Sequence, residues 1–352
     1  MPHTAADLTA NDPRFTAASI DPLTLRYTAG LMKERGFDPQ GMCRGLGFAI
    51  ADLDNPDFKI SYRQASLMIR RAQKLVREPG LGLSVGLRQT PVSWGLVGFG
   101  MMSSATLGQA MALGLAYQKD AGSLADIQLE TGASQVALVA DLIFHDPEIE
   151  VFLIEEMFSG IVSTTRFMVG PQFSPAAVEL IYAAPAHASA YQDLFRCPVR
   201  FNRKRNRLVV DASWVSKPLA THDASVERSV RDLIERSVRA RREKADFGAT
   251  IERVIRDNLA DLPPLARIAA GINLSERTLR RKLLDAGFSY QRLVEAVRKA
   301  RALELLTHSR CTVADVAASV GFSDVRNFRR AFRRWTGVAP ADIREKDSSA
   351  SM

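Results

Sequence analysis

The chain has 352 residues, of which 46% are hydrophobic, and its formal net charge is +8 at pH 7. This much apolar sequence is ample for packed cores in two or three domains, so general disorder is excluded. The charge is segregated: residues 241–352 carry 22 Lys and Arg against 14 Asp and Glu, whereas residues 1–240 carry 25 of each. A neutral first part and a basic last third indicate a sensor joined to a nucleic-acid-binding domain, and not a uniformly basic membrane-surface protein.

The three cysteines, Cys43, Cys197 and Cys311, are isolated and form no CxxC pair. They predict neither a disulfide framework nor a zinc site, and they favour a reducing compartment. The N-terminus has no basic region followed by an apolar run, and no stretch reaches about 18 consecutive apolar residues. We therefore expect a cytoplasmic protein that is neither secreted nor membrane-spanning.

Taken in chain order, residues 1–20 are rich in Ala, Thr, Asp and Pro without periodicity, which predicts a flexible lead. Asp21 and Pro22 make an N-cap and a first helical position. The region that follows is predicted to be mainly helical to about residue 119. Two capping-box patterns support this prediction: Ser61 with Gln64, and Thr106 with Gln109.

Residues 80–100 contain six glycines, which suggest a phosphate-binding loop at first sight. However, no predicted strand precedes them, and neither GxGxxG nor GxxxxGK[ST] occurs. Close packing of backbones is the better explanation for the glycines.

The hydrophobic residues then change from helical spacing to alternation with polar residues, a period of two. Residues 127–144 predict a hairpin, 147–169 a helix, 178–182 a strand, and 199–211 two strands around a basic turn at 203–206. We therefore expect an α+β effector or dimerisation domain over residues 21–215. Residues 216–248 form the predicted linker, with a charged amphipathic helix at 223–245. Two heptads are short for a self-sufficient coiled coil, so this helix either bridges the domains or supplies part of a dimer contact.

A duplicated pattern occupies the last third of the chain. In residues 312–344, Val313, Val316, Ala317 and Val320 recur at helical spacing, Gly321 ends that helix, and Ser323 with Asp324 begins a second. Residues 265–287 repeat the first helix at a shift of 48 and the second at a shift of 49. A predicted helix of about 20 residues joins the copies, about 30 Å long, close to the roughly 34 Å of one DNA turn.

The second helix of each copy carries a basic face. These cations could form only a solvated surface, but the caps, the turn and the terminal Pro340 favour a helix-turn-helix. A basic helix fits the DNA major groove, where arginine can donate two hydrogen bonds to guanine. The basic faces consist of Arg277, Arg280, Arg281 and Lys282 in the first copy, and Arg326, Asn327, Arg329, Arg330, Arg333 and Arg334 in the second.

The runs GFSD and NFRRAFRRWTG, followed by Pro340 and IR, resemble the second helix-turn-helix of the AraC/XylS family of bacterial transcription regulators. The resemblance covers residues 249–346, before a tail at 347–352. It implies an all-α DNA-binding domain with two helix-turn-helix motifs joined by a linker helix. The pair Arg326 and Asn327 departs from the polar, often uncharged residues usual in the family, which leaves the target sequence open.

The same resemblance assigns roles to the basic faces. Arg277, Arg280 and Arg281, with Arg326 and Arg330, match positions from which the family reads base edges. Arg329, Arg333 and Arg334 are expected to contact the DNA backbone. Thr278, Lys282 and Asn327 complete the predicted DNA-binding set.

The segments LGLSVGL, WGLVGFGMMSS and PVRFNRKRNRLVVDASWVSKPL resemble the arabinose-binding-type effector domain of one branch of the family. This resemblance implies a sensor but names neither a ligand nor the residues of its pocket. The sequence therefore predicts a homodimeric transcription regulator that acts as an activator, binds promoter DNA and a small organic effector, and recruits RNA polymerase.

Two other functions compete with this hypothesis. A DNA-repair methyl acceptor needs an activated cysteine and usually a zinc cluster, and the three isolated cysteines lack that context. No GxSxG occurs and the histidines show no ligand spacing, so we expect no enzyme, metal or cofactor. An architectural DNA binder, whose first 220 residues only mediate protein contacts, stays open.

Overall fold

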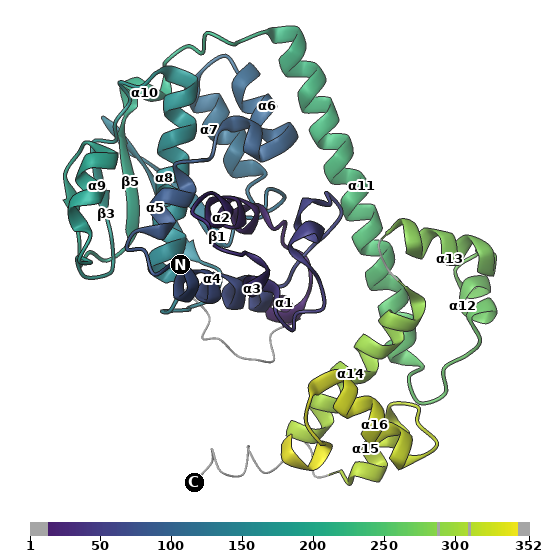
Figure 1. The fold of residues 1–352 in the computed structure, drawn as a ribbon. Helices are drawn as coiled ribbons and strands as arrows, with labels where there is room; N and C mark the ends of the chain where they lie inside the picture. The colour runs from purple at the N-terminus through teal and green to yellow at the C-terminus, as the bar shows by residue number, and fades with distance from the viewer. Residues whose placement is uncertain (1–12, 287–288, 309–310, 344–352) are drawn as a thin grey trace. The chain divides into compact units, whose positions relative to one another are not determined.

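The computed structural model describes residues 13–286, 289–308 and 311–343 (Figure 1). The chain divides into two compact units, Met1–Arg236 and Ser237–Met352, which are described separately. Of the sequence predictions, the tail at 347–352 and the closing Gly287 of the first repeat lie outside the described residues. None of the described helices is long and apolar enough to span a membrane.

The first unit combines helices with one five-stranded sheet, as the α+β prediction requires. The strands are β1 Ala125–Thr131, β2 Gln135–Leu142, β3 Ala177–Glu179, β4 Val199–Arg200 and β5 Asn206–Asp211, in the order β1-β2-β5-β3-β4. All neighbours are antiparallel except β3 and β4. The predicted hairpin is confirmed, with Leu129 of β1 opposite Leu138 of β2. β2 is buried on both faces from Val136 to Ala140, and Ala137 and Val139 on one face pack in a small cluster with Ala177 and Val209.

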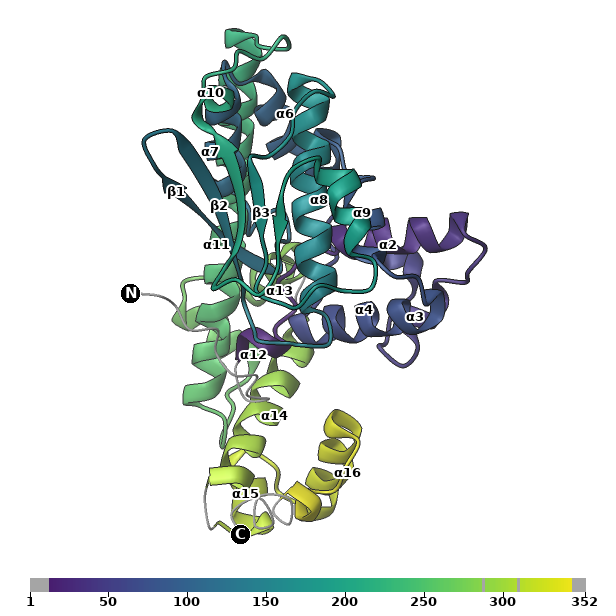
Figure 2. The same ribbon diagram turned by 90° about the vertical axis from the view of Figure 1, so that its left-hand side faces the viewer.

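α8 runs beside this sheet in both views (Figures 1 and 2). α8 buries most of its residues around its whole circumference, which marks it as the central helix of the unit. The helices of the first unit are α1 Pro13–Thr16, α2 Leu23–Glu34, α3 Gln40–Cys43, α4 Tyr62–Val76, α5 Leu81–Gly86, α6 Gly95–Ser103, α7 Leu107–Ala116, α8 Glu150–Val169, α9 Ala188–Phe195 and α10 Ala212–Val215, with 3-10 turns η1 Ile50–Asp54 and η2 Pro91–Trp94.

Glycines let α5 approach α8 closely. A Cβ on Gly82 would collide with the carbonyl of Phe152, and one on Gly86 would collide with the carbonyl of Glu156. A Cβ on Gly98 of α6 would collide with the carbonyl of Pro91. The interpretation of the glycine-rich stretch as close backbone packing, and not a phosphate loop, agrees with these contacts.

The predicted flexible lead of residues 1–20 needs correction in its second half. Residues 13–16 form α1, and the Phe15 ring lies 5.8 Å from the Tyr62 ring and 5.4 Å from the Phe144 ring. Ile20 and Ile60 exchange backbone hydrogen bonds of 2.9 and 3.0 Å. The Phe15 side chain thus anchors this segment to the core, although the composition of the segment shows no hydrophobic pattern. Residues 1–12 lie outside the described part of the chain.

The second unit is all-α. It holds α12 Leu265–Gly271, α13 Glu276–Asp285, α14 Tyr290–His308, α15 Val313–Ser319 and α16 Val325–Thr336. The end of α11 Ala224–Asp257 also belongs to it, because Ile251 and Ile255 are fully buried in the same core as Leu279 and Phe332. α11 therefore passes the predicted boundary at 248/249 without a break.

Candidate nucleic-acid interface

The arginines of α16 face outward because the apolar residues between them are buried. Phe328 and Phe332 are fully buried, and Ala331 is 7% exposed. Asp324 caps the helix by accepting a hydrogen bond of 2.9 Å from the Arg326 backbone N–H. Gly337, with φ of 81°, ends it. With one stripe of the helix in the core, the arginines can occupy only the opposite surface.

The predicted DNA-binding residues of α16 are all exposed. They are Arg326, Asn327, Arg329, Arg330 and Arg333. Among the described residues none of these four arginines forms an ion pair with a carboxylate. Arg334 differs, because its Nη2 lies 2.7 Å from Oε1 of Glu295 in α14. The face thus presents several uncompensated positive charges, the arrangement that attracts a phosphate backbone.

α13 presents the corresponding face of the first copy. Ser275 caps the helix by accepting from the Thr278 backbone N–H at 3.1 Å, while Leu279 and Leu283 are buried. The cations Arg277, Arg280, Arg281 and Lys282 are exposed, and Thr278 is half-buried against its cap. Thr278 is thus part of the cap as well as of the predicted DNA-binding set.

Two of the four cations on α13 already have partners. Arg280 pairs with Glu276 at 2.7 Å one turn away, and the Lys282 ammonium lies 5.6 Å from the centroid of the Phe247 ring in α11. Arg277 and Arg281 have no such ion pair within the described chain. Both lie on the surface opposite Leu279 and Leu283, one turn apart, as do Arg326 and Arg330 on α16.

The turn before α16 is held by a residue that sequence reasoning missed. Arg298 of α14 donates from Nη2 to the carbonyl of Gly321 at 3.2 Å, and its guanidinium carbon lies 4.9 Å from the Phe322 ring centroid. Burial lowers the pKa of Arg298 from its ordinary value. Together with Glu295, it borders a shallow groove beside α16. That groove is lined by Glu295, Arg298, Phe322, Asn327, Arg330, Ala331, Arg334 and Trp335.

The linking helix α14 joins the two copies. α14 has 19 residues, which corresponds to about 28 Å at about 1.5 Å per residue. Leu293 near its start and Leu306 near its end are both buried in the one core that holds residues of both copies. This length is close to the roughly 34 Å between successive major-groove positions on one side of a duplex.

The environments of two cysteines disfavour the methyl-acceptor alternative. Burial raises the pKa of the Cys43 thiol, and burial raises that of Cys197 to about 11. A nucleophilic thiolate needs the opposite shift. Within the described residues no group of three or more His, Cys, Asp and Glu side chains could hold a metal ion.

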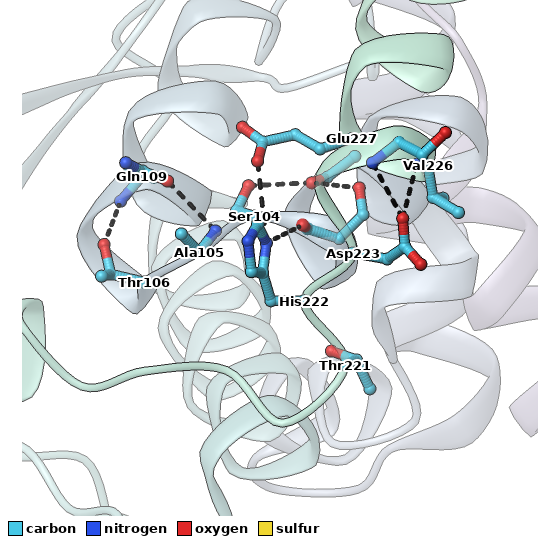
Figure 3. A network of polar contacts seen from close by, with 12 residues as sticks. Ser104, Ala105, Thr106, Gln109, Thr221, His222, Asp223, Val226 and Glu227 are labelled. Carbon is cyan, nitrogen blue, oxygen red and sulfur yellow. Dashed lines mark hydrogen bonds and ion pairs between the residues drawn. The ribbon is translucent and has the colours of Figure 1, made fainter.

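The residues just before α11 are anchored to the last turn of α6 (Figure 3). Thr221 donates to the carbonyl of Met102 at 2.5 Å, and Nδ1 of His222 lies 2.9 Å from the carbonyl oxygen of Ser103. Asp223 accepts backbone N–H bonds from Ser225 and Val226 at 2.8 and 2.9 Å, which caps α11. The end of α6 is therefore bonded directly to the residues that lead into α11.

The comparisons with known proteins agree with this geometry. Residues 36–219 match the arabinose-binding N-terminal domain of AraC transcription regulators, and residues 268–346 match a helix-turn-helix domain. The first match covers more than half of the chain, so the chain belongs to the AraC family of transcription regulators. It is a DNA-binding transcriptional regulator with an arabinose-binding-type N-terminal domain. Because these regulators are not enzymes, the prediction of a non-enzymatic protein is confirmed.

Several relatives span nearly the whole chain. The ornithine utilization regulator of Pseudomonas aeruginosa is 28% identical over 94% of this chain and 98% of its own length. An uncharacterized HTH-type transcriptional regulator of Mycobacterium tuberculosis is 27% identical over 90% of this chain and 94% of its own. The crystal structure of the transcriptional regulator CdpR from Pseudomonas aeruginosa is 22% identical, with a TM-score of 0.47 over 92% of this chain and 98% of that one.

Proposed function

We propose that this protein is a sequence-specific transcription activator, controlled by a small organic effector that binds in the N-terminal unit. The observation that carries the DNA-binding part is the repetition of one outward pair of arginines on both recognition helices. Arg277 and Arg281 on α13 correspond to Arg326 and Arg330 on α16, at the same shift of 49 that relates the buried residues Leu283 and Phe332.

In this proposal each pair reads base edges in one major groove, and α14 spaces the two grooves along one side of the duplex. Arg280, which the family resemblance places among the base-reading residues, is assigned to the DNA backbone here because it is already paired with Glu276. Lys282, Asn327, Arg329, Arg333 and Arg334 also contact the backbone and set the register. Thr278 joins them through its position at the N-terminus of α13, where backbone N–H groups favour a phosphate. Because the partner is promoter DNA, we place the protein in the cytoplasm.

The effector acts by shifting the protein between two arrangements for which it has different affinities. We infer that α11 transmits this difference, because the residues that lead into it are bonded to the end of α6 and its last turns belong to the core of the second unit. The protein works as a homodimer and recruits RNA polymerase once the effector is bound. The exposed Val226 and Leu233 of α11 supply apolar surface for the dimer contact.

Two experiments test this proposal in sequence. A genome-wide binding map in the native host identifies the operator, and reporter output from that operator is then compared between the intact chain and residues 237–352 fused to an unrelated dimeriser. We choose residue 237 and not 249 because Phe247 packs against the core of the second unit. The fusion should bind the operator yet lose every response to growth conditions that alter the intact protein.

Identical responses from both proteins would show that the first unit is no sensor, which is what the architectural alternative expects. A ligand screen by thermal shift on the intact chain completes the test. Ornithine belongs in that screen because a relative over nearly the full chain is named an ornithine utilization regulator. Operator binding that is equally strong for residues 1–236 alone would contradict the assignment of DNA binding to the second unit.

A further inference from the structure

The first unit contains a small cavity with a buried carboxylate in its wall. It lies where α2, the residues around η2, the turn before β1 and α8 meet, and its volume is about 40 Å³. At roughly 10–15 Å³ per water, this is space for about three water molecules or the head of a small ligand. Glu156 of α8, only 6% exposed, lines it.

Glu156 is bonded only by neutral groups. Thr24 of α2 donates to Oε1 at 3.0 Å, and Nε2 of Gln89 donates to the same oxygen. The second carboxylate oxygen receives no hydrogen bond from the described residues. The adjacent Glu155 is different, because it lies 2.5 Å from Nε2 of His187, a ring that can carry a proton. A buried carboxylate without a cation is costly, and a ligand cation would supply what the protein does not.

Close packing fixes the positions of these polar groups. Gln89 is 3% exposed, and its side chain passes so close to Gly160 that a Cβ there would lie 2.6 Å from its amide oxygen. The remaining walls are mostly apolar, with Leu23, Leu124, Ile127 and Leu153 all buried. Trp94 also lines the cavity, and its indole N–H is buried without an acceptor among the described residues.

We propose that this cavity is the effector subsite and that it takes a small organic cation, a primary aliphatic ammonium whose head pairs with Glu156 and whose stem contacts the apolar walls. This inference rests on the proposed function, since it names the chemistry of the effector. A single carboxylate among apolar walls recognises a ligand that carries one positive charge on an apolar stem. The same carboxylate repels an anion.

The protonation state of Glu156 adds an independent signature. Burial raises its pKa to about 7, and the bonds from Thr24 and Gln89 oppose that rise. No charged side chain among the described residues contributes to the shift. Only the ionised carboxylate binds a cation, and a primary amine stays protonated below pH 9. The dissociation constant should therefore rise about tenfold between pH 8 and pH 6, as the carboxylate becomes protonated.

The test uses the full chain and n-butylammonium chloride, with n-butanol, sodium butyrate and sodium chloride as matched probes. Calorimetric titration and thermal shift should detect the amine alone. Glu156→Gln, which keeps the shape and removes the charge, should abolish binding and its pH dependence while far-UV circular dichroism stays unchanged. Glu148→Gln, on an exposed carboxylate just before α8, is the control that should bind as the native protein does.

A second variant keeps the proposal falsifiable if Glu156→Gln does not fold. Thr24→Val removes the hydroxyl that lowers the pKa of Glu156, so amine binding should persist with its pH midpoint moved upward. Retained amine binding in Glu156→Gln, or equal binding of n-butanol, would overturn the proposal. Reporter output separates this inference from the proposed function. Amine binding without a reporter response would contradict the proposal that an effector controls the protein. A reporter response to an effector without amine binding would contradict only the proposal that this cavity is the effector subsite.

Discussion

The two helix-turn-helix copies share their geometry and differ in charge. Leu279 and Leu283 in α13 occupy the places of Phe328 and Phe332 in α16, and all four are buried. α13, however, carries four cations together with the carboxylates Glu276 and Asp285, whereas α16 carries five arginines and no acid. The core dictates which residues face inward, but it leaves the outer face free to change.

The turns show the same contrast in the backbone. Gly321 in the second copy has φ of 78°, and its counterpart at a shift of 48, Asn273, has φ of 58°. Both positions require the left-handed region, which glycine adopts freely and asparagine tolerates. A Cβ on Gly321 would also collide with the carbonyl of Leu259. The second turn is therefore packed more tightly than the first.

The largest effect is expected in the shared core. Phe332→Ala should destabilise the second unit by about 3–5 kcal/mol, and the matched Leu283→Ala by about 2–5 kcal/mol, because each removes a fully buried side chain. Urea unfolding of residues 237–352 measures both. A loss below about 1 kcal/mol for either change would mean that the two copies do not share one core.

The next largest losses of stability are expected from substitutions in the two turns. Gly321→Ala is expected to cost more than about 2 kcal/mol, because a left-handed alanine alone costs about 1–2 kcal/mol and the Leu259 carbonyl must also move. Asn273→Ala should cost about 1 kcal/mol, since that backbone already accommodates a side chain. The same unfolding experiment compares them, and equal costs would remove the distinction between the two turns.

Specific recognition should depend on both copies alike. Arg330→Ala and Arg281→Ala are each expected to lose about 1–3 kcal/mol of discrimination at defined bases, because each removes one base contact. Fluorescence anisotropy on the mapped operator and on single-base variants of it provides the measurement. Equal losses on every DNA sequence would place these arginines on the backbone instead.

The smallest effects concern a pair of equivalent positions with opposite charge, Asp285 and Arg334. Arg334→Ala should weaken binding to all sequences alike and reduce the slope of log affinity against log salt by about one. Its exposed pair with Glu295 contributes only about 0.2–1 kcal/mol to stability. Asp285→Ala should strengthen binding slightly instead, and a change of the same sign in both variants would contradict the electrostatic comparison.

The local features of the chain were predictable because their causes lie within one or two helical turns. The capping box of Ser61 with Gln64 forms as its spacing predicts, and Thr106 caps α7. The same holds for the positions of the basic faces, which follow from helical periodicity alone. The flexible lead was wrong from residue 13 onward because the contact that orders it, from Phe15 to Phe144, joins residues far apart in sequence.

The amino-acid sequence by itself determined the family, the duplicated helix-turn-helix and the outward arginines, since periodicity, caps and turns act over a few residues. Only the tertiary structure decided that Arg334 is already paired, because its partner Glu295 lies 39 residues away. It also decided that α11 is continuous and that Glu156 meets Thr24 and Gln89 at a cavity. Such contacts depend on how distant elements pack, and no short-range pattern in the chain encodes them.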